Sequence, residues 1–269
     1  MSDILVFGTM GEIGTVAEES LKKHHLDVVR VDFPQNTLRD EPGYVRTLKK
    51  AIEQCHPKMI LPVGCTIAIS RTDIPDAIFV PIGNENNIVR LESKTLSSAL
   101  ATELGIPQPR FFKDAADAQG TPVIFKRDNS FGGSGVYRPR TVQALQNLID
   151  HEKGGKFLIE EYICGQDRSV DAIRWNGYFR AECYQSVRQL GGQGPALERE
   201  KVEDQRLCLY ARTILDAIDY QGVCGMDFRI DNSGRAYFLE CNPRLTGGIA
   251  LQIKTGFDIP FLLWSMKEH

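Results

Sequence analysis

The 269-residue sequence lacks the features that would place it in a membrane or on nucleic acid. Its longest apolar stretches, such as MILPVGCTIAIS, are well short of the roughly 20 residues that span a bilayer. It also has no excess of positive charge, because 32 Lys and Arg face 35 Asp and Glu. Phosphate neutralisation needs a basic face, so we expect a protein that binds neither nucleic acid nor membranes.

The cysteines offer neither a disulfide framework nor a thiolate zinc site. There are seven, an odd number, and none forms a CxxC pair. The N-terminus, MSDILVFG, contains an acid and runs directly into a strand-like segment, which argues against a signal peptide. Together these features predict reduced thiols and a cytoplasmic protein.

The pattern of elements changes near residue 88, within the segment PIGNENNIV. Before it, strands and helices alternate, which predicts a parallel sheet: strands at Ile4–Gly8, Asp27–Phe33 and Met59–Val63, with helices at Thr15–His25 and Val45–Cys55. After it, strand hairpins dominate, with one strong hairpin signal at Asp-Asn-Ser-Gly between two strands. The predicted fold class is therefore α/β followed by α+β.

Three glycines lie where the first strand turns into a helix. Gly8, Gly11 and Gly14 have GxxGxxG spacing, and Asp32 ends the next strand. This arrangement fits a dinucleotide site, which would make the protein a nicotinamide oxidoreductase, but the spacing is looser than GxGxxG. A backbone-amide site for another anion and simple helix–sheet packing are the alternatives.

A lysine and a glycine-rich turn in the second part indicate a phosphate site. Lys126 lies in the strand VIFK, where a charge is unfavourable unless an anion meets it. The turn Ser130-Phe131-Gly132-Gly133-Ser134-Gly135 follows, and its backbone N–H groups could bind phosphate oxygens. It is not a Walker loop, since it leads to a strand, so a flap that closes over phosphates is the natural alternative. A plain hairpin connection is the other.

The segment FLIEEYICGQDRSVD places carboxylates beside a strand end. Glu160 and Glu161 end the strand, and a turn through Gly165 leads to Asp167 and Asp171. Unpaired backbone groups at a strand end could bind an adenine edge, and a carboxylate a few residues on could accept from ribose hydroxyls.

The segment GMDFRIDNSGRAYFLECNPRLTGG predicts a metal site. Glu240 and Asn242 are two residues apart and so point to one face of a strand. If Ile230 pairs with Arg235, Asp227 faces Phe238 and lies diagonal to Glu240 on that face. Oxygen ligands of this kind suit Mg²⁺ or Mn²⁺ rather than zinc. A three-residue loop would instead put Asp227 on the opposite face. Arg244, held after Pro243, could bind a phosphoryl or carboxylate oxygen.

These segments together resemble the ATP-grasp superfamily, most closely the carbamoyl-phosphate-synthase-like carboxylate–amine ligases. The resemblance covers roughly residues 90–250 and implies a Rossmann-like pre-ATP-grasp domain over 1–88. An ATP-grasp domain over 89–269 would follow, with a small subdomain at about 89–164 and a metal and acceptor subdomain at 165–269. It also implies that members of this kind are often homodimers.

The resemblance also implies a role for each site residue. Lys94, at the start of a helix, and Lys126 would contact phosphates and adenine, and the turn at 130–135 would be the phosphate flap. Glu160 and the backbone of Glu161, Tyr162 and Ile163 would meet adenine, and Asp167 would hold the ribose. The magnesium ligands would be Asp227, Glu240 and Asn242, and Arg244 would stabilise the transferred phosphoryl group.

The predicted activity is that of an ATP- and Mg²⁺-dependent, ADP-forming ligase. A small carboxylate would be activated as an acyl phosphate, which an amine or another nucleophile such as a thiol would then attack. Arg188, in the glycine-containing segment SVRQLGGQGPALERE that also contains Arg199, would orient the acceptor, although a solvated loop fits equally well. A non-catalytic ATP-binding module and a small-molecule kinase of the same fold are the alternatives.

Overall fold

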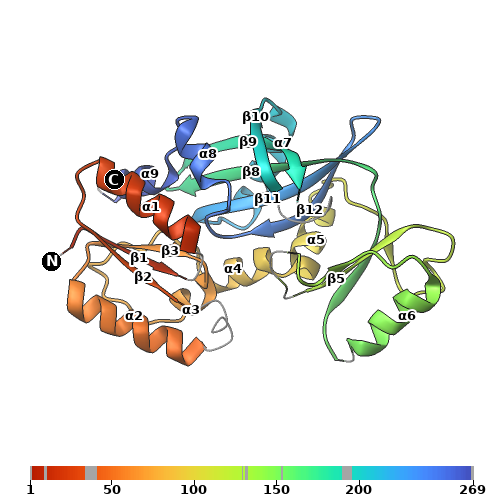
Figure 1. Ribbon diagram of the computed structural model, residues 1–269, viewed down its shortest axis with the longest axis horizontal. Coiled ribbons are helices and arrows are strands. Elements are labelled where there is room, and N and C mark those ends of the chain that lie inside the picture. Colours follow the sequence, from red (N-terminus) through yellow and green to blue (C-terminus); the bar gives the residue numbers. More distant parts are fainter. Residues whose placement is uncertain are drawn as a thin grey trace.

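A computed structural model shows an elongated molecule built around three β-sheets (Figure 1). The structure describes residues 2–8, 11–33, 41–128, 130, 133–152, 154–189 and 196–267. Within these ranges the sheets have three, four and five strands. Gly132, one of the predicted flap residues, lies outside the described residues.

The first sheet is parallel and has the order β2-β1-β3. Its elements and the short helix that follows are β1 (Ile4–Gly8), α1 (Gly11–Lys23), β2 (Val28–Asp32), α2 (Glu41–Cys55), β3 (Met59–Val63) and α3 (Thr66–Ser70). Alternation along β1 covers both of its faces, because Ile4 and Val6 pack in the cluster with α1 while Leu5 and Phe7 pack in the cluster with α2. Figure 1 shows these two helices on opposite sides of the sheet. The predicted strand–helix alternation of this part is confirmed.

The glycine at the end of β1 is explained by packing. A Cβ atom on Gly8 would lie 2.4 Å from the carbonyl oxygen of Val63 in β3, so no larger residue fits without moving backbone. Asp32, the other residue of the predicted dinucleotide pattern, forms an ion pair with Arg30 at 3.0 Å between Oδ2 and Nε.

The second sheet is antiparallel; Lys126 lies on one of its inner strands, and Lys94 begins a helix that precedes the sheet in the chain. Its order is β4-β7-β5-β6, and α6 covers one face through Leu145. The elements of this part are α4 (Glu85–Glu92), α5 (Lys94–Glu103), β4 (Phe111–Phe112), β5 (Val123–Arg127), β6 (Val136–Tyr137), α6 (Val142–His151) and β7 (Phe157–Glu161). The glycine-rich turn joins β5 to β6, as expected for a strand-to-strand connection.

The third sheet has the order β10-β9-β8-β11-β12 and is antiparallel. Its elements and the helices that follow are β8 (Gly165–Trp175), β9 (Tyr178–Gln189), β10 (Ala196–Val202), α7 (Gln205–Ala217), β11 (Gly222–Asp231), β12 (Ala236–Asn242), α8 (Ile249–Lys254) and α9 (Ile259–Met266). One face packs against α4, α5 and α7 through residues such as Val170, Met226 and Phe238. The other face is rich in charged side chains, and it is this face that forms the site.

The predicted register of the β11–β12 hairpin is wrong, and a β-bulge compensates for the error. Ile230 pairs with Ala236 rather than Arg235, and Phe228 pairs with Phe238. Continued without interruption, this register would put Glu240 on the core face. An irregularity between Asp227 and Phe228 accommodates one extra residue on the partner strand, Leu239, so that Asp227 pairs directly with Glu240. The bulge thus restores the shared face that the prediction required.

Two other expectations differ from the structure. The predicted boundary near residue 88 lies in the middle of α4, whose Asn84 caps the helix by accepting from the Asn87 N–H at 2.9 Å. The glycine-containing segment that includes Arg188 and Arg199 is not simply a loop, because β9 runs to Gln189 and β10 starts at Ala196. The residues between these strands are outside the described ranges.

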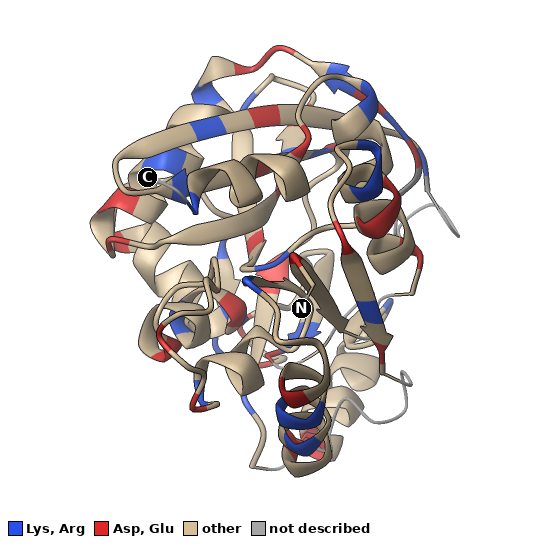
Figure 2. Cartoon of the chain, turned by 90° about the vertical axis from the view of Figure 1, so that its left-hand side faces the viewer, with Lys and Arg blue, Asp and Glu red and all other residues tan. Residues whose placement is uncertain are grey.

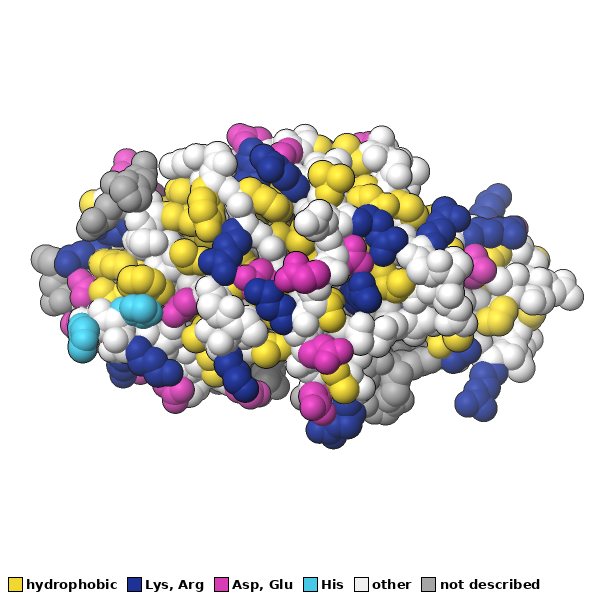
Figure 3. Space-filling view, turned by 90° about the horizontal axis from the view of Figure 1, so that it is seen from above, with side chains coloured by type: hydrophobic (Ala, Val, Ile, Leu, Met, Phe, Trp, Pro, Cys, Tyr) yellow, Lys and Arg dark blue, Asp and Glu magenta, His cyan; other side chains and the backbone are white. Residues whose placement is uncertain are grey.

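Charges of both signs are interspersed over the molecule. Lys and Arg alternate with Asp and Glu along the chain (Figure 2), and the face in Figure 3 shows no continuous area of one sign. In the described part of the chain, no helix has both the length and the hydropathy needed to cross a membrane.

We predict that Gly8→Ala lowers the free energy of unfolding by about 1–3 kcal/mol, because the added methyl group meets the Val63 carbonyl. Urea unfolding followed by circular dichroism measures the change. Gly11→Ala is the matched control, since a Cβ there meets no atom within 4 Å. Equal stability of the two variants would contradict the packing explanation.

Candidate functional site

A cavity of about 650 Å³ lies between the four-stranded sheet and the charged face of the five-stranded sheet. It collects predicted site residues from each segment to which the sequence analysis gave a nucleotide or metal role after residue 90: Lys94, Lys126, Ser130, Gly133, Glu160, Glu161, Tyr162, Ile163, Asp167, Asp227, Glu240, Asn242 and Arg244. Ser134, Gly135 and Arg188 are not part of its lining. The convergence of segments spread over 150 residues of sequence makes this cavity the candidate site.

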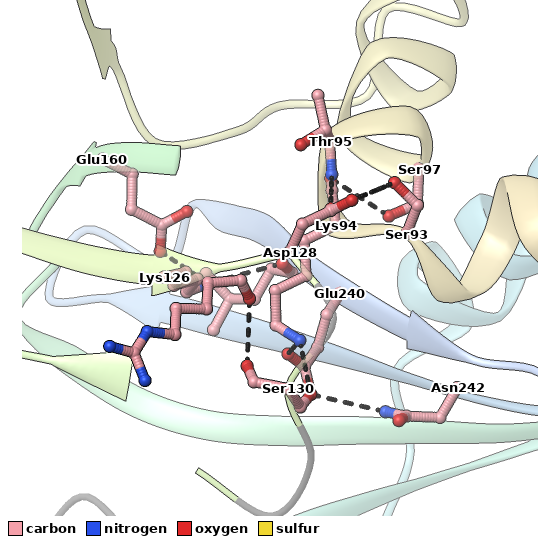
Figure 4. A network of polar contacts seen from close by, with 12 residues as sticks. Ser93, Lys94, Thr95, Ser97, Lys126, Asp128, Ser130, Glu160, Glu240 and Asn242 are labelled. Carbon is pink, nitrogen blue, oxygen red and sulfur yellow. Dashed lines mark hydrogen bonds and ion pairs between the residues drawn. The ribbon is translucent and has the colours of Figure 1, made fainter. Parts of the chain in front are cut away.

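Two buried lysines reach the cavity from different elements (Figure 4). Lys94 is the first residue of α5, and its Nζ donates to the carbonyl oxygen of Ser130 at 2.9 Å and lies 3.4 Å from Glu240 Oε2. Lys126, in β5, pairs with Glu160 at 2.6 Å. Each lysine is only 5% exposed. A buried ammonium group is unfavourable without anions nearby. The pairing with Glu240 and Glu160 therefore stabilises the two charged lysines in the cavity wall.

The pKa of Glu160 is raised, because burial disfavours its carboxylate while Lys126 only partly compensates. Glu92, at the end of α4, is a half-buried acid outside the cavity lining that the sequence interpretation did not assign to the site. Burial raises its pKa, and Arg244 and Lys94 oppose that shift. The cavity wall thus holds charges of both signs in a medium that screens them weakly.

The hairpin brings two carboxylates together. Asp227 and Glu240 are directly opposite each other on neighbouring strands, and Asn242 follows on the same face. Burial and the negative charge of Glu240 raise the pKa of Asp227 to about 7. Although burial alone would raise the pKa of Glu240, the adjacent Lys94 and Lys126 lower it. Two facing acids of which one resists ionisation form a set suited to a divalent cation.

This donor set fits Mg²⁺ or Mn²⁺ by its chemistry. Both carboxylates and the Asn242 amide offer oxygen, the ligand atom that these ions prefer. Among the described residues, no group of three or more His, Cys, Asp or Glu could hold a metal without other ligands. A cation at Asp227 and Glu240 would therefore take its remaining ligands from water or from a bound phosphate, as is usual for Mg²⁺.

The segment after β7 forms the wall on the other side of the lysines. The N–H groups of Glu161 and Tyr162 already donate to the carbonyl oxygens of Arg110 and Pro122, each at 2.8 Å. No hydrogen bond within the described structure uses the N–H of Ile163, so this group can bind a ligand. Arg138 lies over the Tyr162 ring, with its guanidinium carbon 3.5 Å from the ring centroid.

Asp167 and Arg244 line the cavity in positions fixed by neighbours. Asp167 forms an ion pair with Arg229, with 2.5 Å between Oδ1 and Nε. Arg244 donates to Asn242 Oδ1 at 3.0 Å and to the Leu245 carbonyl at 3.2 Å. Any ligand that binds the side-chain oxygen of Asn242 would therefore share it with Arg244.

The described part of the glycine-rich turn closes on itself. Ser130 Oγ donates to the Arg127 carbonyl at 2.9 Å, and the Arg127 N–H donates to the Gly135 carbonyl at 2.9 Å. A Cβ atom on Gly135 would lie 2.4 Å from Ser130 Oγ, and Gly133 has a φ of 78°. Both glycines are therefore required by the shape of the turn.

Arg188 is not where the sequence interpretation expected it. Its side chain is 66% exposed, and its nearest acid is Glu198, at 3.7 Å. Arg199, on β10 opposite Ser186, lines the cavity instead. Its Nη1 atom is buried without a hydrogen-bond partner in the described part of the structure. The one-residue irregularities in the β9–β10 pairing separate these two arginines, and no sequence pattern signals them.

The end of the cavity near Arg199 contains polar residues to which the sequence interpretation assigned no role in the site. Asp171, on β8, is 1% exposed, and its Oδ1 accepts from Thr246 Oγ1 at 2.7 Å. Burial raises its pKa, and Arg199 and Thr246 oppose the shift. The sequence does indicate this placement, because Asp167, Ser169 and Asp171 alternate along β8 and so share one face of the strand.

Comparisons with known proteins agree with the geometry. Residues 154–269 match a protein-family model described as "ATP-grasp in the biosynthetic pathway with Ter operon". The N-terminal section of a carbamoyl phosphate synthase large chain from Methanopyrus kandleri is 24% identical, over 91% of this chain and 51% of that protein. The chain thus spans about half the length of that relative. It spans less than half of two others, a carbamoyl phosphate synthase large chain and a phosphoribosylamine–glycine ligase.

Two solved structures share the fold. Biotin carboxylase from Campylobacter jejuni, in complex with a nucleotide, superposes with a TM-score of 0.78 at 18% identity, over 100% of this chain and 71% of that one. The biotin carboxylase domain of 2-oxoglutarate carboxylase from Hydrogenobacter thermophilus, with MgADP and bicarbonate, superposes with a TM-score of 0.79 at 17% identity, over 100% and 70%.

We predict that Asp227→Asn removes a pH dependence of stability. The raised pKa of Asp227 means that its contribution to stability is complete below about pH 4 and is lost as the pH rises to about 7. Without divalent cations, the variant should therefore gain about 1–4 kcal/mol relative to the wild type between pH 4.5 and pH 8.

Urea unfolding in EDTA at several pH values measures this difference, and Asp76→Asn, an exposed acid, is the control. Added Mg²⁺ should stabilise the wild type at pH 8 more than the Asp227→Asn variant. A constant difference across the pH range would contradict the pKa shift.

Proposed function

We propose that the chain is an ATP-grasp enzyme, an ATP- and Mg²⁺-dependent ligase that activates a small carboxylate as an acyl phosphate; the family-model match over residues 154–269, the curated relatives and the shared fold support this. An amine or a similar nucleophile then attacks this intermediate, and ADP and phosphate are released. The observation that carries the proposal is the convergence of Lys94 and Lys126 with Asp227, Glu240 and Asn242 in one cavity.

The nucleotide would lie between the two sheets. Its adenine would meet the free N–H of Ile163 beside Tyr162, and its ribose would meet Asp167. Lys94 and Lys126 would exchange part of their pairing with Glu240 and Glu160 for phosphate oxygens. The turn at 130–135 would cover the phosphates, because its backbone carries no bulky side chain at the two described glycines.

The metal site would be formed by Asp227, Glu240 and Asn242, whose facing carboxylates fit a divalent cation. A Mg²⁺ ion held there would supply positive charge that offsets the charge of the phosphates. The chain's own contribution is to hold the Asn242 oxygen in place through Arg244 and to keep Glu240 ionised through Lys94.

The transfer needs positioning and charge rather than a protein nucleophile. A carboxylate oxygen of the acceptor attacks the γ-phosphorus, and the bond from that phosphorus to the β–γ bridging oxygen breaks. Arg199 would hold the carboxylate, since its guanidinium lines the cavity with an unused N–H group. Lys126 and Arg244 would offset charge on the transferred phosphoryl group. The amine then displaces phosphate from the acyl carbon.

We also propose that the chain divides by topology into a pre-ATP-grasp part at 1–88 and an ATP-grasp part at 89–269. The small subdomain would be about 89–164, and the metal and acceptor subdomain would be 165–269. The parallel three-stranded sheet and the two antiparallel sheets support this division. A homodimer is proposed on the family resemblance alone.

The function is tested by ADP release over a panel of amino acids and small carboxylates, with hydroxylamine to trap acyl phosphates. Glu240→Gln should lower Mg²⁺-dependent turnover by at least about 100-fold while the fold stays intact, because it removes a metal-binding charge. Glu198→Gln, an exposed acid outside the cavity, should leave turnover unchanged. Full turnover by a folded Glu240→Gln variant would refute the metal assignment.

The two arginines of the β9–β10 hairpin give a second test. With the carboxylate found in the screen, Arg199→Ala should reduce kcat/KM for that substrate by about 10–100-fold, as expected for a lost charge-assisted hydrogen bond. Nucleotide affinity should stay within about twofold. Arg188→Ala should have no effect, since its side chain points outside the cavity lining. The reverse result would restore Arg188 as the acceptor residue.

A further inference from the structure

A buried aspartate connects the two lysine-bearing elements without touching the cavity. Asp128 directly follows β5, two residues after Lys126, and is 5% exposed. Its carboxylate accepts from the Thr95 N–H at 2.8 Å and from Ser93 Oγ at 2.9 and 3.0 Å (Figure 4). Its own N–H donates to the Lys156 carbonyl at 2.9 Å, which fixes it to the sheet.

These contacts lie on both sides of Lys94. Ser93 and Thr95 are its sequence neighbours in the first turn of α5, and both are bound to the same carboxylate. Ser93 Oγ caps the helix by accepting from the Leu96 N–H at 3.2 Å, and Asp128 adds a second acceptor for this helix end, from a different element. The extra contacts therefore tie the helix end to β5 rather than merely ending the helix.

We propose that Asp128 is a positioning residue that fixes Lys94 for the phosphates of the nucleotide. It does so by holding the first turn of α5 against the end of β5. Because Lys126 lies on that same strand, the single carboxylate makes one rigid unit of two lysines that come from different elements. This inference rests on the proposed function, since it takes phosphate to be the anion that Lys94 meets.

A purely structural role for Asp128 makes a different prediction. Loss of a structural contact would change stability, or weaken every part of nucleotide binding alike. Loss of a positioning contact would weaken only the part of the affinity that comes from phosphate and Lys94. Comparing ligands with and without phosphates separates the two.

The experiment measures adenosine, ADP and ATP as competitors of a fluorescent ATP analogue, with Mg²⁺, on the full chain. Asp128→Ala should weaken ADP and ATP binding by about tenfold, as for loss of one charge-assisted contact, and leave adenosine binding within about twofold. Asp114→Ala is the matched control, because Asp114 Oδ1 also accepts from two backbone N–H groups, at 2.8 and 2.9 Å, in a turn outside the cavity.

A double-mutant cycle then assigns the effect to one lysine. In a Lys94→Ala background, Asp128→Ala should cause no further loss of ATP affinity, whereas in a Lys126→Ala background it should still cause a clear loss. Asp128→Asn, which keeps an acceptor for the Thr95 N–H, serves if the alanine variant does not fold, and it should give a smaller loss of the same selectivity.

Several outcomes would overturn the inference. Equal loss for adenosine and ATP, an unchanged ATP affinity, or a full effect in the Lys94→Ala background would each show that Asp128 does not act through Lys94. Failure of the proposed function is distinguishable, because it would show as a wild-type chain that binds neither ATP nor ADP, or that binds them without Mg²⁺-dependent ADP release for any carboxylate. Wild-type nucleotide binding with a silent Asp128→Ala would refute this inference alone.

Discussion

The candidate site depends on charges that are buried together and hold one another in place. Lys126 with Glu160, and Lys94 with Glu240, place two ammonium groups and two carboxylates in one wall of the cavity. None of these groups would be favourable there without the others. Asp227 forms no such ion pair within the described residues, and the positive charge of Arg199 opposes the rise in its pKa. The pKa of Asp227 is high because its carboxylate is buried where the cavity wall has little positive charge. A divalent cation bound there would supply the missing positive charge.

The fold places these charges by packing two sheets of different character around one cavity. The five-stranded sheet buries one face against α4, α5 and α7 and leaves its other face charged. The parallel sheet is not a separate body, because its core continues into the last helices through Ile249, Phe257 and Leu263. The first and last segments of the chain therefore share one core, and Figure 1 shows both ends on the same side. A division at residue 88 describes topology and not independent folding.

The sequence predicted what depends on local pattern and on residue type. Strand β3 has the predicted bounds, Met59–Val63, because a short apolar run between polar segments leaves little choice. The lysines, the turn at 130–135 and the hairpin of the predicted metal site could be singled out because buried charges, glycines and alternating side chains are visible in the sequence, and the structure brings residues from each of them to one cavity. Arg199 and Asp128 were not placed, because their roles depend on strand pairing and on a helix meeting a strand 33 residues away, as in the contact of Thr95 with Asp128. Contacts between distant segments of this kind produce no repeating pattern in the sequence, so the sequence alone does not reveal them.

The bulge at Leu239 also limits how this hairpin can change during evolution. Insertion or loss of one residue in the turn at 232–234 would rotate Glu240 and Asn242 from the cavity into the apolar core, unless the bulge disappeared at the same time. Length changes in the turn and in β12 are thus coupled, and related chains should gain or lose residues there in pairs. A sequence alignment with a single-residue gap in this hairpin would therefore align Glu240 and Asn242 with residues that do not face the cavity.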